Sequence, residues 1–176
     1  FPDILYYLKA VPEKLAAKIN ALKKHDPFSR IDFFGFPANM KDVLELNQEE
    51  TRRLVNTICE AGGYDILVID LESTFHGRVT AALKESNVVY WLLQGGFPGI
   101  YRNKLLLEQY SSLLEQEGEP LMEKTRFLLG KWVGDPPYPR RLEDWDLSGV
   151  IPYVPEWKTM FRRDQIFGNE RFHVHC

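Results

Sequence analysis

The heptapeptide Tyr64–Asp70, Tyr-Asp-Ile-Leu-Val-Ile-Asp, constrains the fold of this chain more than any other feature. Its residues Ile66–Ile69 are all apolar and follow one another without a polar interruption. Such a continuous run is typical of a strand buried on both faces, as the strands of parallel sheets are. We therefore predict a buried parallel β-strand over residues 64–71. Its carboxyl end would bring Asp70 to the rim of an α/β sheet, where ligands bind in open sheets.

Helical and strand patterns alternate on both sides of this run, which is typical of an α/β protein with a mostly parallel sheet. Asn47 is a helix N-cap residue, Glu50 completes a capping box, and Gly62-Gly63 would end that helix. We predict a three-layer α/β/α single domain over residues 1–176. The other expected elements are helices over 3–24 (with a break at Pro12), 77–85 and 100–117, and strands over 31–36, 87–93, 125–132 and 149–152.

Composition narrows the classes of protein that this chain can be. The 176 residues are 44% hydrophobic and carry a formal net charge of −3, so no electrostatic signal for nucleic acid is present. No apolar run approaches the roughly 20 residues of a transmembrane helix. Cys59 and Cys176 are the only cysteines, which favours a reducing cytoplasm over a disulfide framework. Because Phe1 leads directly into a helical pattern, we expect a fragment that lacks its N-terminal portion.

Asp70 is the first candidate for chemistry. A carboxylate at the end of a buried strand can hold Mg²⁺, directly or through water, or can orient an attacking water. Glu72 and Ser73 follow in the loop and are weaker candidates to contact a phosphate or a nucleophilic water. The alternative is structural: Asp70 would cap the next helix or turn, and Glu72 and Ser73 would be ordinary turn residues. The apolar run fixes the position of Asp70, so for Asp70 it favours a functional role over a structural one. It gives no such support for Glu72 or Ser73.

The remaining candidates for a catalytic or binding role have weaker support in the sequence. We interpret His76 as structural, and the terminal segment His173–Cys176 as a tail, because a metal site would need further ligands. The segment Pro152–Trp157 is a candidate wall for an adenine base. The loop Gly95–Gly99 is rich in glycine, but it lacks the Gly-Lys-Ser/Thr of a phosphate-binding loop, and that motif occurs nowhere in the chain.

The order of these motifs resembles a known family. Tyr64–Asp70 resembles the strand with the Walker-B-like aspartate in the MinD/ParA/CpaE family of deviant Walker ATPases, which are bacterial P-loop NTPases. The resemblance covers most of residues 1–168. The further segments that carry it, mainly toward the CpaE-like branch, are Phe36–Asn39, Asp42–Leu46, the helix from Asn47, Ser86–Leu93 and Gly149–Pro152.

The resemblance implies a P-loop NTPase-like fold with ATP and Mg²⁺ as cofactors. Asp70 would position Mg²⁺ or water, and Pro152 and Tyr153 would lie against the base. It also implies nucleotide-dependent homodimerisation or a positioning switch that acts on an unidentified protein partner. The Walker A loop of the family is absent from this chain, so we expect it before Phe1 in the intact parent, and ATP hydrolysis only there. The chain also departs from the family at Asp70–Ser73, where Asp-x-Pro/Gly is frequent, and at Gly130-Lys131, where an Asn often contacts the base.

Two other functions stay open. A catalytically silent relative would keep the fold in order to bind a partner. A response-regulator receiver would accept phosphate on Asp70, and Tyr64–Leu71 fits its local pattern. The length of the chain and the lack of Pro-x-Met-x-Gly after Asp70 count against the receiver.

Overall fold

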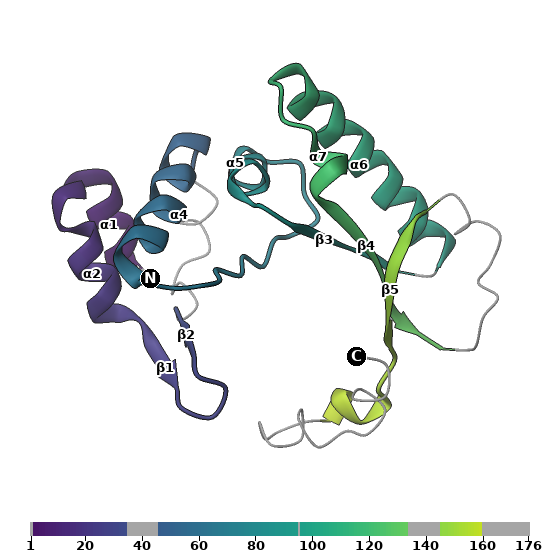
Figure 1. Ribbon diagram of the computed structural model, residues 1–176, viewed down its shortest axis with the longest axis horizontal. Helices are drawn as coiled ribbons and strands as arrows, with labels where there is room; N and C mark the ends of the chain where they lie inside the picture. The colour runs from purple at the N-terminus through teal and green to yellow at the C-terminus, as the bar shows by residue number, and fades with distance from the viewer. Residues whose placement is uncertain (1, 35–45, 95, 134–144, 160–176) are drawn as a thin grey trace. The chain divides into compact units, whose positions relative to one another are not determined.

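The structure is a computed structural model that describes residues 2–34, 46–94, 96–133 and 145–159. The chain divides into two compact units, Phe1–Ser86 and Asn87–Cys176 (Figure 1). Helices occur in both units, and the second unit contains a three-stranded parallel sheet. The predicted α/β class is therefore confirmed, while the single domain over residues 1–176 stays a prediction. No helix in the described ranges has the length and hydropathy needed to cross a membrane.

The first unit is built mainly from helices. They are α1 (Pro2–Ala10), the 3₁₀ turn η1 (Pro12–Lys14), α2 (Leu15–Leu22), α4 (Gln48–Gly62) and α5 (Gly77–Glu85). The predicted break at Pro12 is confirmed, because Pro12 opens η1. The predicted capping box is also present: the Asn47 side chain accepts from Glu50 N–H at 2.8 Å, and Glu50 accepts from Asn47 N–H at 3.0 Å. Gly63 ends α4 in the left-handed conformation, with φ of 59°.

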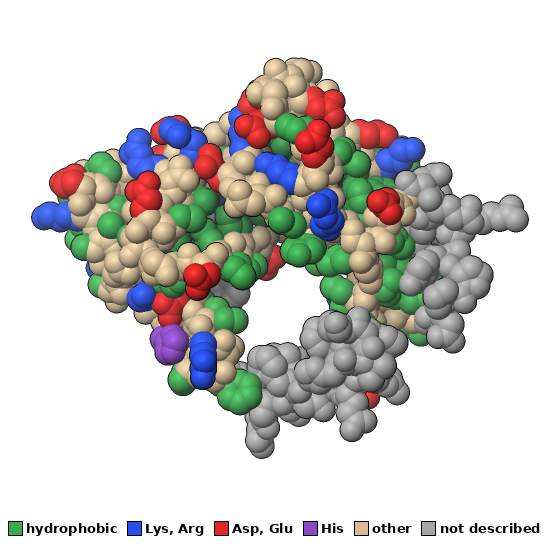
Figure 2. All heavy atoms as spheres, in the orientation of Figure 1, with side chains coloured by type: hydrophobic (Ala, Val, Ile, Leu, Met, Phe, Trp, Pro, Cys, Tyr) green, Lys and Arg blue, Asp and Glu red, His purple; other side chains and the backbone are tan. Residues whose placement is uncertain are grey.

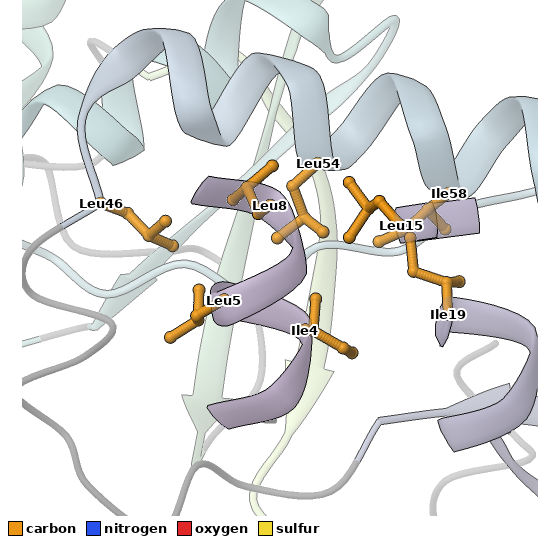
Figure 3. Packing of buried hydrophobic residues seen from close by; sticks show 8 residues of the cluster. All are labelled: Ile4, Leu5, Leu8, Leu15, Ile19, Leu46, Leu54 and Ile58. Atoms are coloured by element: carbon orange, nitrogen blue, oxygen red, sulfur yellow. The ribbon is translucent and has the colours of Figure 1, made fainter. Parts of the chain in front are cut away.

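One hydrophobic cluster holds these helices together. Figure 3 shows its side chains meeting between the helices, and α1, α2 and α4 all contribute. Burial of each Leu or Ile side chain contributes about 1.5–3 kcal/mol, so this cluster is the main source of stability in the unit. Its members are Ile4, Leu5, Leu8, Leu15, Ile19, Leu46, Leu54 and Ile58.

A short antiparallel hairpin of β1 (Lys24–Asp26) and β2 (Ile31–Phe33) follows α2. The expected strand over 31–36 is confirmed as far as Phe33, and residues 35–45 lie outside the described ranges. β1 was not expected, because Asp26-Pro27 reads as the end of a helix. The turn is fixed by Ser29, whose hydroxyl donates to Asp26 Oδ2 at 2.7 Å.

The predicted strand over residues 64–71 is wrong for this structure. These residues form neither helix nor strand, and Figure 1 shows them as the coil between α4 and α5. Leu67 packs against the cluster of the first unit, whereas Ile66 and Val68 are 79% and 84% exposed. An apolar run becomes a strand only when neighbouring strands take up its backbone hydrogen bonds. No described strand pairs with this segment.

The second unit carries the parallel sheet. Its strands are β3 (Val89–Gln94), β4 (Thr125–Trp132) and β5 (Leu147–Pro152), in the order β3-β4-β5. The three predicted strands are confirmed to within two residues. The connections are α6 (Phe97–Gln116) and α7 (Leu121–Lys124), and η3 (Pro155–Thr159) follows β5. Because α6 begins at Phe97, the loop expected over Gly95–Gly99 is shorter than predicted, and Pro98 stands in the first turn of the helix.

The sheet of the second unit is packed on one face. Trp91 of β3 donates its indole N–H to Asn103 of α6 at 2.8 Å, which ties the helix to that face. Leu93 and Leu129 on neighbouring strands are fully buried. The Phe127 ring meets Trp145 edge to face, with the centroids 4.9 Å apart. This packing makes β3 and β4 the stable part of the unit.

Candidate functional site

Residues 64–71, which pair with no described strand, are called the unpaired segment. Asp70 lies near its end, just before the loop that leads to α5. Its side chain is exposed, as are those of Glu72 and Ser73. The predicted position of Asp70 at a sheet rim depended on a strand that does not form here, so that position stays a prediction. The exposed carboxylate is nevertheless open to water and to a cation.

Glu72 has a local partner. Its carboxylate forms an ion pair with the guanidinium of Arg78, which lies in the first turn of α5. The Arg78 side chain is 11% exposed, and its Nη1 atom is buried without a hydrogen-bond partner. The pair therefore closes the loop onto the helix. This geometry favours the structural alternative for Glu72 over contact with a ligand.

The start of α5 is fixed by two further residues. His76 is the N-cap, and its Nδ1 atom accepts from Arg78 N–H at 3.2 Å. Gly77 follows, and a Cβ atom at this position would lie 3.1 Å from Cγ of Gln48 on α4. A side chain at this position would therefore require the Gln48 side chain to move by a few tenths of an ångström. The structural interpretation of His76 is confirmed.

The predicted base wall lies in the second unit, at the carboxyl end of β5. Tyr153 donates its backbone N–H to Trp132 O at 2.9 Å, so its position is fixed by the end of β4. Lys158 Nζ lies 5.4 Å from the centre of the Tyr153 ring, and hydrogen bonding to Tyr153 raises the pKa of Lys158. Pro152 and Tyr153 are both half-buried. Asp70 belongs to the other unit, Phe1–Ser86.

A charged cluster around Asp32 was missed by the sequence analysis. The Asp32 carboxylate accepts from His25 Nδ1 at 2.7 Å and from the Tyr64 hydroxyl at 2.9 Å, and it pairs with Lys23 at 3.0 Å. The hydrogen bond from His25, followed by those from Lys23 and Tyr64, lowers the pKa of Asp32 to about 2. The hydrogen bond to Asp32 in turn raises the pKa of Lys23.

This Asp32 cluster fixes Tyr64, the first residue of the unpaired segment, to the β1–β2 hairpin. His25 and Asp32 are directly opposite each other in the hairpin register. A sequence signal for the pair would have required recognition of β1, which is only Lys24–Asp26. Because the Asp32 oxygens already accept hydrogen bonds from several donors, we interpret Asp32 as a structural residue.

The residues around Asp70 fit Mg²⁺ only in part. Mg²⁺ is usually held by one or two carboxylates together with waters and substrate phosphates, so Asp70 fits as a single ligand. Within the described ranges, no group of three or more His, Cys, Asp or Glu side chains could hold a metal ion. His173–Cys176 lie outside those ranges. Any Mg²⁺ at Asp70 would therefore need further ligands, such as waters and substrate phosphates.

Charges are mixed on the surface. On the face that Figure 2 shows, Lys and Arg side chains lie among Asp and Glu and do not gather into one basic patch.

Comparison with known proteins gives information on the fold. No protein-family model and no curated protein matches the chain. Among solved structures, the crystal structure of a ParA family ATPase from Chlorobium tepidum TLS matches with a TM-score of 0.67 at 14% identity. The match covers 88% of this chain and 61% of that protein, so the chain spans about three-fifths of its length. At this identity the likeness concerns the fold.

Proposed function

We propose, from the premise that this chain has the fold of a ParA family ATPase, that it is part of a nucleotide-dependent switch of the MinD/ParA/CpaE type. The match in fold over 88% of the chain is the observation that carries the proposal. Asp70 supports it, because this residue follows an apolar run and presents an accessible carboxylate. The proposed location is the bacterial cytoplasm.

In the proposed parent protein, the phosphate-binding loop comes from polypeptide outside residues 1–176. Asp70 would hold Mg²⁺, directly or through water, and the Glu72–Arg78 pair would hold the following loop. Pro152 and Tyr153 form an apolar and aromatic surface for the base. Bound Mg²⁺ would neutralise charge that develops on the phosphates. ATP would favour a homodimer or another partner-binding state, and hydrolysis would end it.

The test is titration of the parent protein with Mg-ATP, followed by measurement of phosphate release. Asp70→Asn keeps the size of the side chain and removes the charge, so turnover should fall by about 10-fold or more. Asp65→Asn is the matched control, because Asp65 is an exposed aspartate on the same segment. Equal turnover in both variants would remove Asp70 from the hydrolytic step.

A catalytically silent interaction module is the second candidate. The Glu72–Arg78 ion pair favours it, since it engages a residue that a hydrolytic loop would leave available. A parent gene without a Walker A motif, together with no heat of binding for Mg-ATP, would support this alternative. The receiver hypothesis predicts covalent labelling of Asp70 by acetyl phosphate, and an unlabelled protein would contradict it.

A further inference from the structure

Tyr64 is held between the end of α4 and the β1–β2 hairpin. A Cβ atom on Gly62 would lie 1.9 Å from Cε2 of Tyr64, so the Tyr64 ring packs directly on the backbone of the last residue of α4. The Asn20 side chain of α2 donates to Ala61 O at 3.3 Å and ties the same helix end to α2. The unpaired segment therefore begins from a position that is fixed by contacts with two helices.

The hairpin reaches Tyr64 through one of its two faces. His25 and Asp32 are opposite each other in the register, and Asp32 accepts from the Tyr64 hydroxyl at 2.9 Å. Successive residues of a strand point to opposite faces, so Ile31 and Phe33 belong to the other face, where they are 58% and 38% exposed. The Asp32 side chain is only 16% exposed. The contact between Asp32 and Tyr64 therefore links the hairpin to the start of the unpaired segment.

The position of Asp70 depends on contacts at both ends of the unpaired segment. No described strand pairs with this segment, so a ladder of backbone hydrogen bonds does not set its course. Tyr64 fixes its start, and the Glu72–Arg78 ion pair fixes the loop just after it. Between these points, Leu67 packs against the cluster of the first unit. A change at one end alters the conformational freedom of the residues between, and therefore the entropy cost of the contact at the other end.

We propose that Tyr64 couples the β1–β2 hairpin to Asp70, so that a ligand at Asp70 stabilises the hairpin and the hairpin contact favours ligand binding. Asp70 lies six positions after Tyr64 and two positions before Glu72. A ligand held at Asp70 restricts the segment, so the contact between Tyr64 and Asp32 then costs less entropy to maintain. Coupling between two sites is reciprocal, so loss of the Tyr64 hydroxyl weakens ligand binding by the same factor. The inference rests on the proposed function in one respect, the identity of the ligand as Mg-ATP.

The first test needs no ligand and releases the segment at the end near Asp70. Glu72→Gln removes the charge that pairs with Arg78, and Glu49→Gln is the matched control, because Glu49 forms an ion pair with another arginine of the same unit. The readout is hydrogen exchange of the Arg30 amide, which donates across the hairpin turn at 2.8 Å. Glu72→Gln should accelerate this exchange roughly 2- to 5-fold, and Glu49→Gln should leave it unchanged.

Repeating Glu72→Gln in a Tyr64→Phe background shows whether the effect passes through the tyrosine hydroxyl. With the hydroxyl absent, Glu72→Gln should cause no further acceleration at Arg30, whereas independent ends would give the same acceleration in both backgrounds. Equal acceleration in the wild-type and Tyr64→Phe backgrounds would overturn the proposal. An Arg30 exchange rate that Glu72→Gln does not change would overturn it as well.

The second test adds Mg-ATP to the parent protein and follows the same amide. Saturating Mg-ATP should slow the exchange of Arg30 by about 5-fold or more in the wild type and in Tyr6→Phe, which alters an exposed tyrosine of α1. In Tyr64→Phe it should not, and this variant should bind Mg-ATP about 5-fold more weakly. Mg-ATP binding of equal strength in the wild type and Tyr64→Phe contradicts this inference alone. A wild type that gives no heat of binding contradicts the proposed function, and the ligand-free test then decides the inference.

Discussion

The segment Ile66–Ile69 and the strand β3 have the same sequence pattern and different structures. Each is an apolar run that predicts a buried parallel strand. β3 is a strand along its whole length, with β4 beside it and α6 across one face. The segment before Asp70 has only the helical cluster on one side, through Leu67, and no described strand as a neighbour.

This difference separates two requirements of a β-strand. Side chains decide which residues can enter a core, but backbone pairing decides whether a ladder forms. Leu67 shows that the segment still directs one side toward the core, as alternation along a strand would require. The exposure of Ile66 and Val68 marks the side on which pairing and cover are lacking.

The largest expected effect on stability comes from shortening one apolar side chain. The loss should be large in β3 and small in the segment Ile66–Ile69. Leu93→Ala removes a fully buried side chain of β3 and should lower the free energy of unfolding by about 2–5 kcal/mol. Val68→Ala removes an exposed side chain and should cost less than about 0.5 kcal/mol. Urea denaturation of residues 1–176 measures both. A cost of 2 kcal/mol or more for Val68→Ala would show that the segment is packed as β3 is.

The sequence predicted most elements of the fold because their signals are local. The Asn47–Glu50 capping box, the break at Pro12 and the apolar runs of β3 and β4 need only neighbouring residues to be recognised. The strand before Asp70 failed because its formation depends on partners distant in sequence. The Asp32 cluster was missed for the same reason: residues 23, 25 and 64 converge on it only after the hairpin and α4 are in place.

The candidate site was predictable to a smaller extent than the fold. Asp70 was found from the pattern before it, and its exposure agrees with access to a ligand. The engagement of Glu72 by Arg78 was not foreseen, since an ion pair over six residues depends on where α5 begins. No local pattern relates Asp70 to Tyr153, which lies in the other unit.

A smaller effect is expected where the unpaired segment is attached at its beginning. Tyr64→Phe removes the hydrogen bond to Asp32 and keeps the ring, so it should lower the free energy of unfolding by about 1 kcal/mol. Amides of residues 65–69 should also exchange faster. Tyr6→Phe is the control, because Tyr6 is an exposed tyrosine of α1. If the two variants are equally stable, the hydroxyl of Tyr64 does not hold the segment.

The Glu72–Arg78 ion pair holds the loop just after the segment. We expect this pair to contribute still less to the free energy of unfolding. A double-mutant cycle with Glu72→Gln and Arg78→Gln should give a coupling energy of roughly 0.5–1 kcal/mol, because Glu72 is partly exposed to solvent. The coupling should decrease in high salt. A coupling near zero would mean that the loop after Asp70 is not fixed by this pair, and the geometric argument for the silent module would fail with it.

The smallest effect concerns pH, since the groups around Asp32 are partly solvated. The pKa of Asp32 is lowered in the folded protein, so its ionised form favours folding. That contribution is complete above the ordinary pKa of an aspartate, near 4, and is lost as the pH falls toward about 2, the pKa in the folded protein. Melting temperatures measured from pH 5 to pH 2 should therefore fall more steeply for the wild type than for Asp32→Asn. Asp65→Asn, which alters an exposed aspartate of the unpaired segment, should keep the wild-type slope. Parallel curves for the wild type and Asp32→Asn would show that the charge of Asp32 does not help to tie the hairpin to Tyr64.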